Sequence, residues 1–173
     1  MRLAISSGHS HRDPGAVGVL REREENVRVA DRLGQLVNAM AGHSAIVFHD
    51  NTSKNSRENV NGTARWHNAQ TRDLDVQIHF NAFKPTQGPR GTEMLYRSDP
   101  TRARAALASK AVADAGDFID RGAKHRTNLG FLNQTQKPAI LTEICFVDSA
   151  SDVRNYQANF DVICSALAEA LTT

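Results

Sequence analysis

Short apolar segments of strand length alternate with longer helical patterns along this chain, and that order constrains the fold more than any other feature. Strands that alternate with helices predict a mostly parallel, twisted sheet with helices on both faces. At 173 residues the chain has the size of one compact domain. We therefore expect a single α/β domain whose sheet has about six strands. Strands are expected at Leu3–Ser7, Ser44–His49, Leu74–Phe80, Gly91–Arg97 and Ala139–Phe146, and helices at Glu22–Ala41, Ser56–Gln70, Thr101–Ala115 and near the C-terminus.

Charge and hydropathy exclude several classes of partner. The chain has 21 Lys and Arg against 19 Asp and Glu, a net charge of +2, and its basic residues do not form a stripe. Nucleic acid is therefore not an expected partner. No apolar run approaches the roughly 20 residues that cross a bilayer, so we expect no membrane insertion. Cys145 and Cys164 lie among apolar residues and are expected to be buried thiols.

Three residues able to carry chemistry lie at or near the expected carboxyl ends of strands. His9 follows the first strand, His79 lies in the third, and Glu143 lies in the last long apolar one. The carboxyl ends of parallel strands meet at one edge of a sheet, where α/β proteins place their binding sites. We therefore expect these three side chains to share one site.

Each of these residues also has a purely structural interpretation. In Ala139–Phe146, every neighbour of Glu143 except Thr142 is apolar. Burying a charge costs several kcal/mol unless it is paired or metal-bound, so Glu143 is either a functional carboxylate, half of a buried ion pair or an edge-facing side chain. Burial would raise its pKa towards the range that suits a general base. His79, taken alone, also fits a core histidine that is hydrogen-bonded to the backbone.

The residue types together suggest a metal site. Neutral imidazoles and a carboxylate are the usual protein ligands of a catalytic zinc ion, with one position left open for water. Glu22, Glu24 and Glu25, at the start of the first helix, are all candidates for the carboxylate. A glutamate in the first turn of a helix is also favoured by the helix dipole alone. The residue types therefore do not choose among the three.

Four segments, taken in order, resemble the amidase type 3 family, which comprises zinc-dependent N-acetylmuramoyl-L-alanine amidases that hydrolyse peptidoglycan. They are Gly8-His9 with Asp13–Gly18, Glu22 ahead of Asn26-Val27, Ile78–Ala82, and Pro138–Val147. Three more segments resemble the bacteriophage endolysin branch of the family: Trp66–Ala69, Arg121–Lys124 and Phe131–Asn133. The similarity covers most of the chain.

The resemblance implies a ligand set and a reaction. His9, Glu22 and His79 would bind one zinc ion, and Glu143 would be the catalytic carboxylate. The implied reaction is hydrolysis, by zinc-activated water, of the amide between N-acetylmuramic acid and the L-alanine of the stem peptide. Glu143 would take a proton from the water and return it to the leaving amine.

Two further residues are candidates for contact with peptidoglycan. Asn81 lies two residues past His79, on the same face of the strand, and Arg121 could pair with a carboxylate of the stem peptide. Both residues also fit a role on the surface or in stabilising a loop.

Residues 1–173 are expected to form a single catalytic domain, monomeric and without a separate cell-wall-binding domain. Met1–Ser7 has too short an apolar run for a signal peptide. The protein is therefore expected to be made in the cytoplasm and to act on the wall after release or export.

Two other functions remain open from the sequence. A zinc peptidase that cuts within the stem peptide would leave peptide attached to muramic acid. A non-catalytic α/β domain that only binds the wall would contain no zinc.

Overall fold

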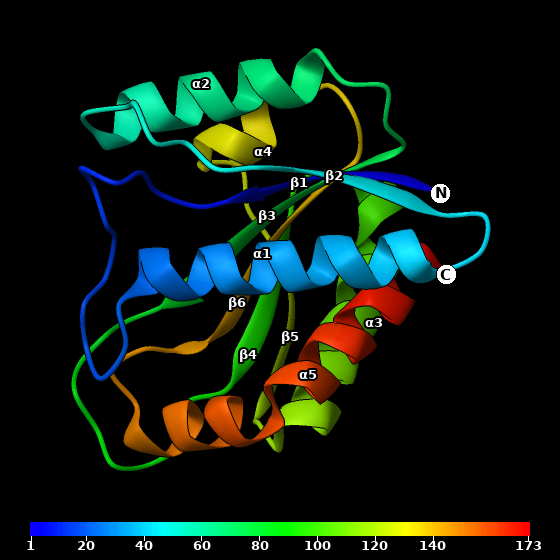
Figure 1. Ribbon diagram of the computed structural model, residues 1–173. Coiled ribbons are helices and arrows are strands. Elements are labelled where there is room, and N and C mark those ends of the chain that lie inside the picture. Colours follow the sequence, from blue (N-terminus) through cyan, green and yellow to red (C-terminus); the bar gives the residue numbers. More distant parts are fainter.

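A computed structural model describes all residues, 1–173, as one α/β domain built on a six-stranded sheet (Figure 1). The strand order is β2-β1-β3-β6-β4-β5. The strands are β1 (Arg2–Ser7), β2 (Ser44–Phe48), β3 (Leu74–Asn81), β4 (Thr92–Tyr96), β5 (Asp120–His125) and β6 (Ala139–Phe146). The helices are α1 (Glu22–Ala39), α2 (Ser56–Asn68), α3 (Asp99–Gly116), α4 (Gly130–Gln134) and α5 (Ala150–Thr172).

The sheet is mostly parallel, as the sequence predicts. Strand β1 pairs in parallel with β2 and β3, β3 with β6, and β4 with β5. Only the β4–β6 pair is antiparallel. The carboxyl ends of β1, β3 and β6 therefore meet at one edge of the sheet.

Helices cover both faces of the sheet (Figure 1). Helices α1, α3 and α5 lie on one face and contribute, with the strands, to a core of 28 buried residues. In β3, Val76, Ile78 and Phe80 point into this core, as their alternation in the sequence predicts. Helices α2 and α4 lie on the opposite face, where Phe131 and Leu132 of α4 pack on apolar residues of β4 and β6.

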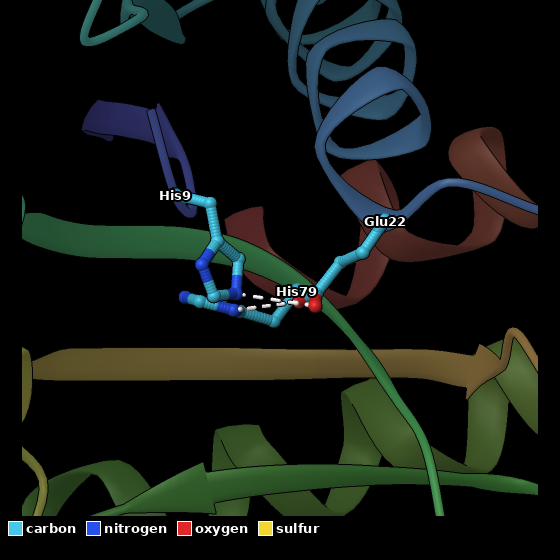
Figure 2. Close-up of side chains that lie close together, drawn as sticks. All are labelled: His9, Glu22 and His79. Carbon is cyan, nitrogen blue, oxygen red and sulfur yellow. Dashed lines mark hydrogen bonds and ion pairs between the residues drawn. The ribbon is translucent and has the colours of Figure 1, made fainter. Parts of the chain in front are cut away.

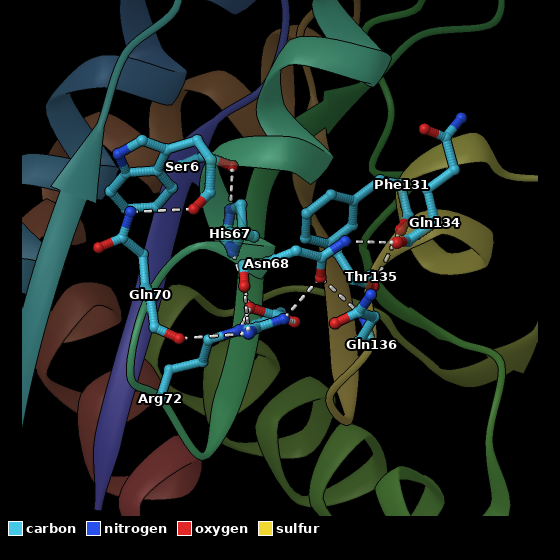
Figure 3. A network of polar contacts seen from close by, with 11 residues as sticks. Ser6, His67, Asn68, Gln70, Arg72, Phe131, Gln134, Thr135 and Gln136 are labelled. Atoms are coloured by element: carbon cyan, nitrogen blue, oxygen red, sulfur yellow. Dashed lines mark hydrogen bonds and ion pairs between the residues drawn. The ribbon is translucent and has the colours of Figure 1, made fainter.

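A buried polar network joins α2 to the sheet (Figure 3). His67 lies 2.8 Å from Asp75 through Nδ1 and 2.9 Å from the hydroxyl of Ser6 through Nε2. Arg72 donates to both carboxylate oxygens of Asp75, at 2.7 and 3.0 Å. Because all of these groups are buried and hydrogen-bonded, they fix where α2 sits on β1 and β3.

Two elements were not placed by the sequence pattern, β5 and the short helix α4. The segment Asp120–His125 contains almost no apolar residue, because β5 is an edge strand whose side chains are mostly exposed or half-buried. Cys145 and Cys164 are free, buried thiols, as expected. No helix is both long enough and apolar enough to cross a membrane.

Candidate metal centre and active site

His9, Glu22 and His79 converge at the edge of the sheet where β1 and β3 end (Figure 2). His9 follows β1, Glu22 is the first residue of α1, and His79 lies near the end of β3. Their potential ligand atoms all lie within 4.8 Å of one another. Nε2 of His9 is 3.1 Å from Oε2 of Glu22, and Nδ1 of His79 is 2.9 Å from Oε1.

The Glu22 carboxylate is buried and held by the backbone as well as by the two rings. The amide of Ala16 donates to Oε2 at 2.8 Å, and the amide of Phe80 donates to Oε1 at 3.2 Å. Burial alone would raise the pKa of Glu22, but hydrogen bonds from His79 and His9 outweigh it and hold that pKa far below its usual value. Glu22 is therefore an anion in position to bind a cation.

The loop that carries His9 is held in a conformation that non-glycine residues seldom adopt. His9 has a φ of 64°, in the left-handed region. The side chain of Asn59 donates to the carbonyl of His9 at 3.0 Å, and that of Asn26 donates to the carbonyl of Gly8 at 3.1 Å. Such strain costs about 1–3 kcal/mol and persists only where the surroundings enforce it, commonly at functional sites.

Two glycines make room for the cluster. A Cβ at Gly8 would lie 2.3 Å from Nε2 of His79. A Cβ at Gly15, whose φ is +71°, would lie 2.4 Å from Oε2 of Glu22 and 2.6 Å from Nε2 of His9. Only glycine allows the backbone to pass this close to the three side chains.

The structure distinguishes among the candidate ligands. Glu24 points away and pairs with Arg21 on the surface, and the Glu25 carboxylate accepts a hydrogen bond from Tyr156. His11 is exposed and lies outside the cluster. Two imidazole nitrogens and one buried carboxylate thus remain, and this donor set fits zinc.

Glu143 lies beside this cluster on β6. It is the register partner of His79 on β3, so the two side chains project from the same face of the sheet. Its Oε2 is buried and has no hydrogen-bond partner, and no cation pairs with it. Burial, with the negative charges of Glu22 and Glu93, raises the pKa of Glu143 well above its ordinary value.

Asn81 and Arg121 are brought together by Glu93, a residue that the sequence analysis did not single out. The buried Glu93 carboxylate accepts from Nε of Arg121 at 2.9 Å and from the amide of Asn81 at 3.4 Å. Glu93 is itself the cross-strand partner of Glu143. The sequence does contain a pattern that could have predicted Glu93. It is an acidic residue within the apolar segment Thr92–Tyr96, as Glu143 is within Ala139–Phe146.

Comparison with known proteins assigns the family. The profile of the N-acetylmuramoyl-L-alanine amidase family, amidase type 3, matches residues 3–173. The chain belongs to this family. It is 30% identical over 156 residues to the N-acetylmuramoyl-L-alanine amidase LytC of Bacillus subtilis, which covers 87% of the chain and 30% of LytC. It is 29% identical to the sporulation-specific N-acetylmuramoyl-L-alanine amidase of the same organism, over 92% of the chain and 61% of that protein.

Solved structures share the fold of this amidase family member. The catalytic domain of CD27L endolysin, which targets Clostridia difficile, superposes with a TM-score of 0.88 at 25% identity, over 99% of this chain and 97% of that one. An N-acetylmuramoyl-L-alanine amidase from Clostridium difficile 630 superposes with a TM-score of 0.86 at 22% identity. The chain thus matches 97% of the CD27L catalytic domain but spans 61% or less of the first curated relatives.

Proposed function

We propose that this protein is a zinc-dependent N-acetylmuramoyl-L-alanine amidase. The observation that carries the proposal is the convergence of His9, Glu22 and His79 beside Glu143, at the carboxyl edge of the sheet. The two histidines and Glu22 would hold the ion. Zinc in such a set supplies Lewis acidity, which activates water and polarises a carbonyl for hydrolysis.

Glu143 is the group that moves protons. A carboxylate with a raised pKa accepts a proton from the attacking water and holds it until the amine leaves. The water oxygen bonds to the lactyl carbonyl carbon, the carbon–nitrogen bond breaks, and Glu143 returns the proton to the L-alanine nitrogen. In this proposal Asn81 and Arg121 contact the substrate next to Glu143. Their shared hydrogen bonds to Glu93, the cross-strand partner of Glu143, support this role.

A bacteriophage or prophage endolysin is the biological role that we propose for this amidase. Similarity to the catalytic domain of CD27L endolysin over nearly the whole of both chains supports this role. In this proposal residues 1–173 act as a monomeric catalytic domain on the peptidoglycan of a bacterial wall, after release or export from the cytoplasm.

Digestion of purified peptidoglycan tests the proposed reaction. The parent protein is expected to release free stem peptides that begin with L-alanine, and to contain one zinc ion per chain. A peptidase that cuts within the stem would instead leave L-alanine attached to muramic acid. If no peptide is released and no zinc is bound, the amidase proposal is wrong and a non-catalytic domain remains.

A further inference from the structure

Two arginines and two phenylalanines form a cationic and aromatic patch near Glu143. Cζ of Arg121 lies 5.1 Å from the ring centroid of Phe146, and Cζ of Arg90 lies 5.5 Å from the same centroid. Arg90 also lies 5.2 Å from the ring of Phe83, which is 80% exposed. We call these four residues the arginine patch. One aromatic ring thus holds two guanidinium groups in a small region of the surface.

Only one of the two guanidinium groups in the arginine patch forms an ion pair. Arg121 pairs with Glu93, but Arg90 forms no ion pair. One Nη of Arg90 donates to the carbonyl of Lys84 at 2.7 Å, and its Nε is buried without a partner. Asp148 and Asp152 also lie close by, but both accept hydrogen bonds from backbone amides and neither forms an ion pair with a guanidinium group. Guanidinium groups bind carboxylates through short, paired hydrogen bonds, so an acidic group on a ligand would complete this arrangement.

The arginine patch adjoins the proposed reaction centre. Phe146 follows Glu143 by three residues and ends β6. Glu93 connects the arginine patch to Glu143, because it bonds to Arg121 and is the cross-strand partner of Glu143. Phe83 is anchored beside them, since its amide donates to Asp148 at 2.8 Å. A substrate whose scissile amide lies at Glu143 would extend a neighbouring group over the patch.

We propose that Arg90 and Arg121 bind a free carboxylate on the peptide arm of the substrate, close to the bond that is cut. Glu93 is a positioning residue, which fixes the orientation of the Arg121 guanidinium. Phe146 and Phe83 stack against the guanidinium groups and limit their rotation. This inference rests on the proposed amidase function and extends it to the choice of substrate.

Two muramyl dipeptides test the proposal, one with the free α-carboxylate on its second residue and one with the corresponding amide. The parent protein is expected to cleave the carboxylate form with a kcat/KM about tenfold higher or more, through a lower KM. Arg90→Gln and Arg121→Gln should each remove most of this preference by raising KM for the carboxylate form only. Arg102→Gln, at an exposed position on α3, is the matched control and should keep the preference.

Each result separates this proposal from the amidase assignment. Equal cleavage of both dipeptides by the parent, or an equal loss on both in the arginine variants, would overturn the carboxylate subsite and leave the amidase function intact. If the parent cleaves neither, calorimetric binding of the free dipeptide L-alanyl-D-glutamate and of its α-amide decides the question. Tighter binding of the acid that is lost in Arg90→Gln supports the subsite, whereas equal binding overturns it.

Discussion

Glu93 and Glu143 face each other across the antiparallel strands β4 and β6, yet only Glu93 has a cationic partner. The Glu143 carboxylate lies beside the like charge of Glu93, and its Oε2 is buried without a hydrogen-bond partner. A structural ion pair at Glu143, which the sequence left open, is therefore absent. The buried carboxyl group of Glu143 is therefore energetically unfavourable. Proteins commonly keep such a group where it takes part in a reaction.

Glu143→Gln is expected to separate activity from stability. The amide has the same shape but cannot accept and return a proton, so kcat should fall by about 100-fold or more. The free energy of unfolding should stay equal or rise, because a repelled buried carboxyl group has been replaced by a neutral one. Hydrolysis assays and thermal unfolding of the same samples measure both effects. A variant that still cleaves peptidoglycan at the parent rate would remove Glu143 from the mechanism.

Zinc binding is expected to depend on His79 and not on His11. His79 faces the Glu22 carboxylate, whereas the exposed His11 lies outside the cluster, although it follows His9 by two residues. His79→Ala should lose zinc and all hydrolysis, and His11→Ala should retain both. Metal analysis of dialysed samples measures this directly. Retention of stoichiometric zinc by His79→Ala would show that the ion binds elsewhere.

Gly8→Ala is expected to disturb the metal centre without adding or removing a ligand. The new methyl group would lie 2.3 Å from the His79 ring and push it away from Glu22. Displacing a ligand in this way should weaken zinc affinity by about 10- to 100-fold, as the loss of groups that orient metal ligands does. A competition titration with a chelator measures the change.

Gly62→Ala supplies the matched control for Gly8→Ala. Gly62 lies inside α2, and the nearest atom to its added Cβ is 3.9 Å away. This substitution should leave zinc affinity unchanged and stabilise the fold by about 0.5–1 kcal/mol, because alanine favours a helix more than glycine. If both variants bind zinc like the parent, the close approach at Gly8 has no role in the site.

The sequence predicts the parallel part of the sheet better than its far edge. Strands such as Ala139–Phe146 have dense apolar residues, because they are buried on both faces. The charged edge strand β5 has no such pattern, and its position follows only from pairing with β4. Glu93 has the same local pattern as Glu143, an acidic residue within an apolar strand, but its partner Arg121 lies 28 residues away in sequence. Contacts between distant segments leave no local periodicity that the sequence would display.

The His67–Asp75 network predicts how stability depends on pH. Burial lowers the pKa of His67, and the nearby charge of Arg72 adds to this effect, while Asp75 opposes it, so the net pKa lies below 6.5. In the unfolded chain the imidazole takes up a proton near pH 6.5. As pH falls below 6.5, protonation then favours the unfolded state, and the folded state should lose up to about 1.4 kcal/mol per pH unit from this residue.

His67→Gln tests this dependence, because glutamine does not titrate. The variant should be less stable at pH 7, since buried hydrogen bonds to Ser6 and Asp75 are disturbed. Between pH 6.5 and 5, however, its free energy of unfolding in urea should decline less steeply than that of the parent. His11→Gln, at an exposed position, should keep the parent slope. Equal slopes for the parent and His67→Gln would mean that folding does not lower the pKa of His67, and this prediction would be wrong.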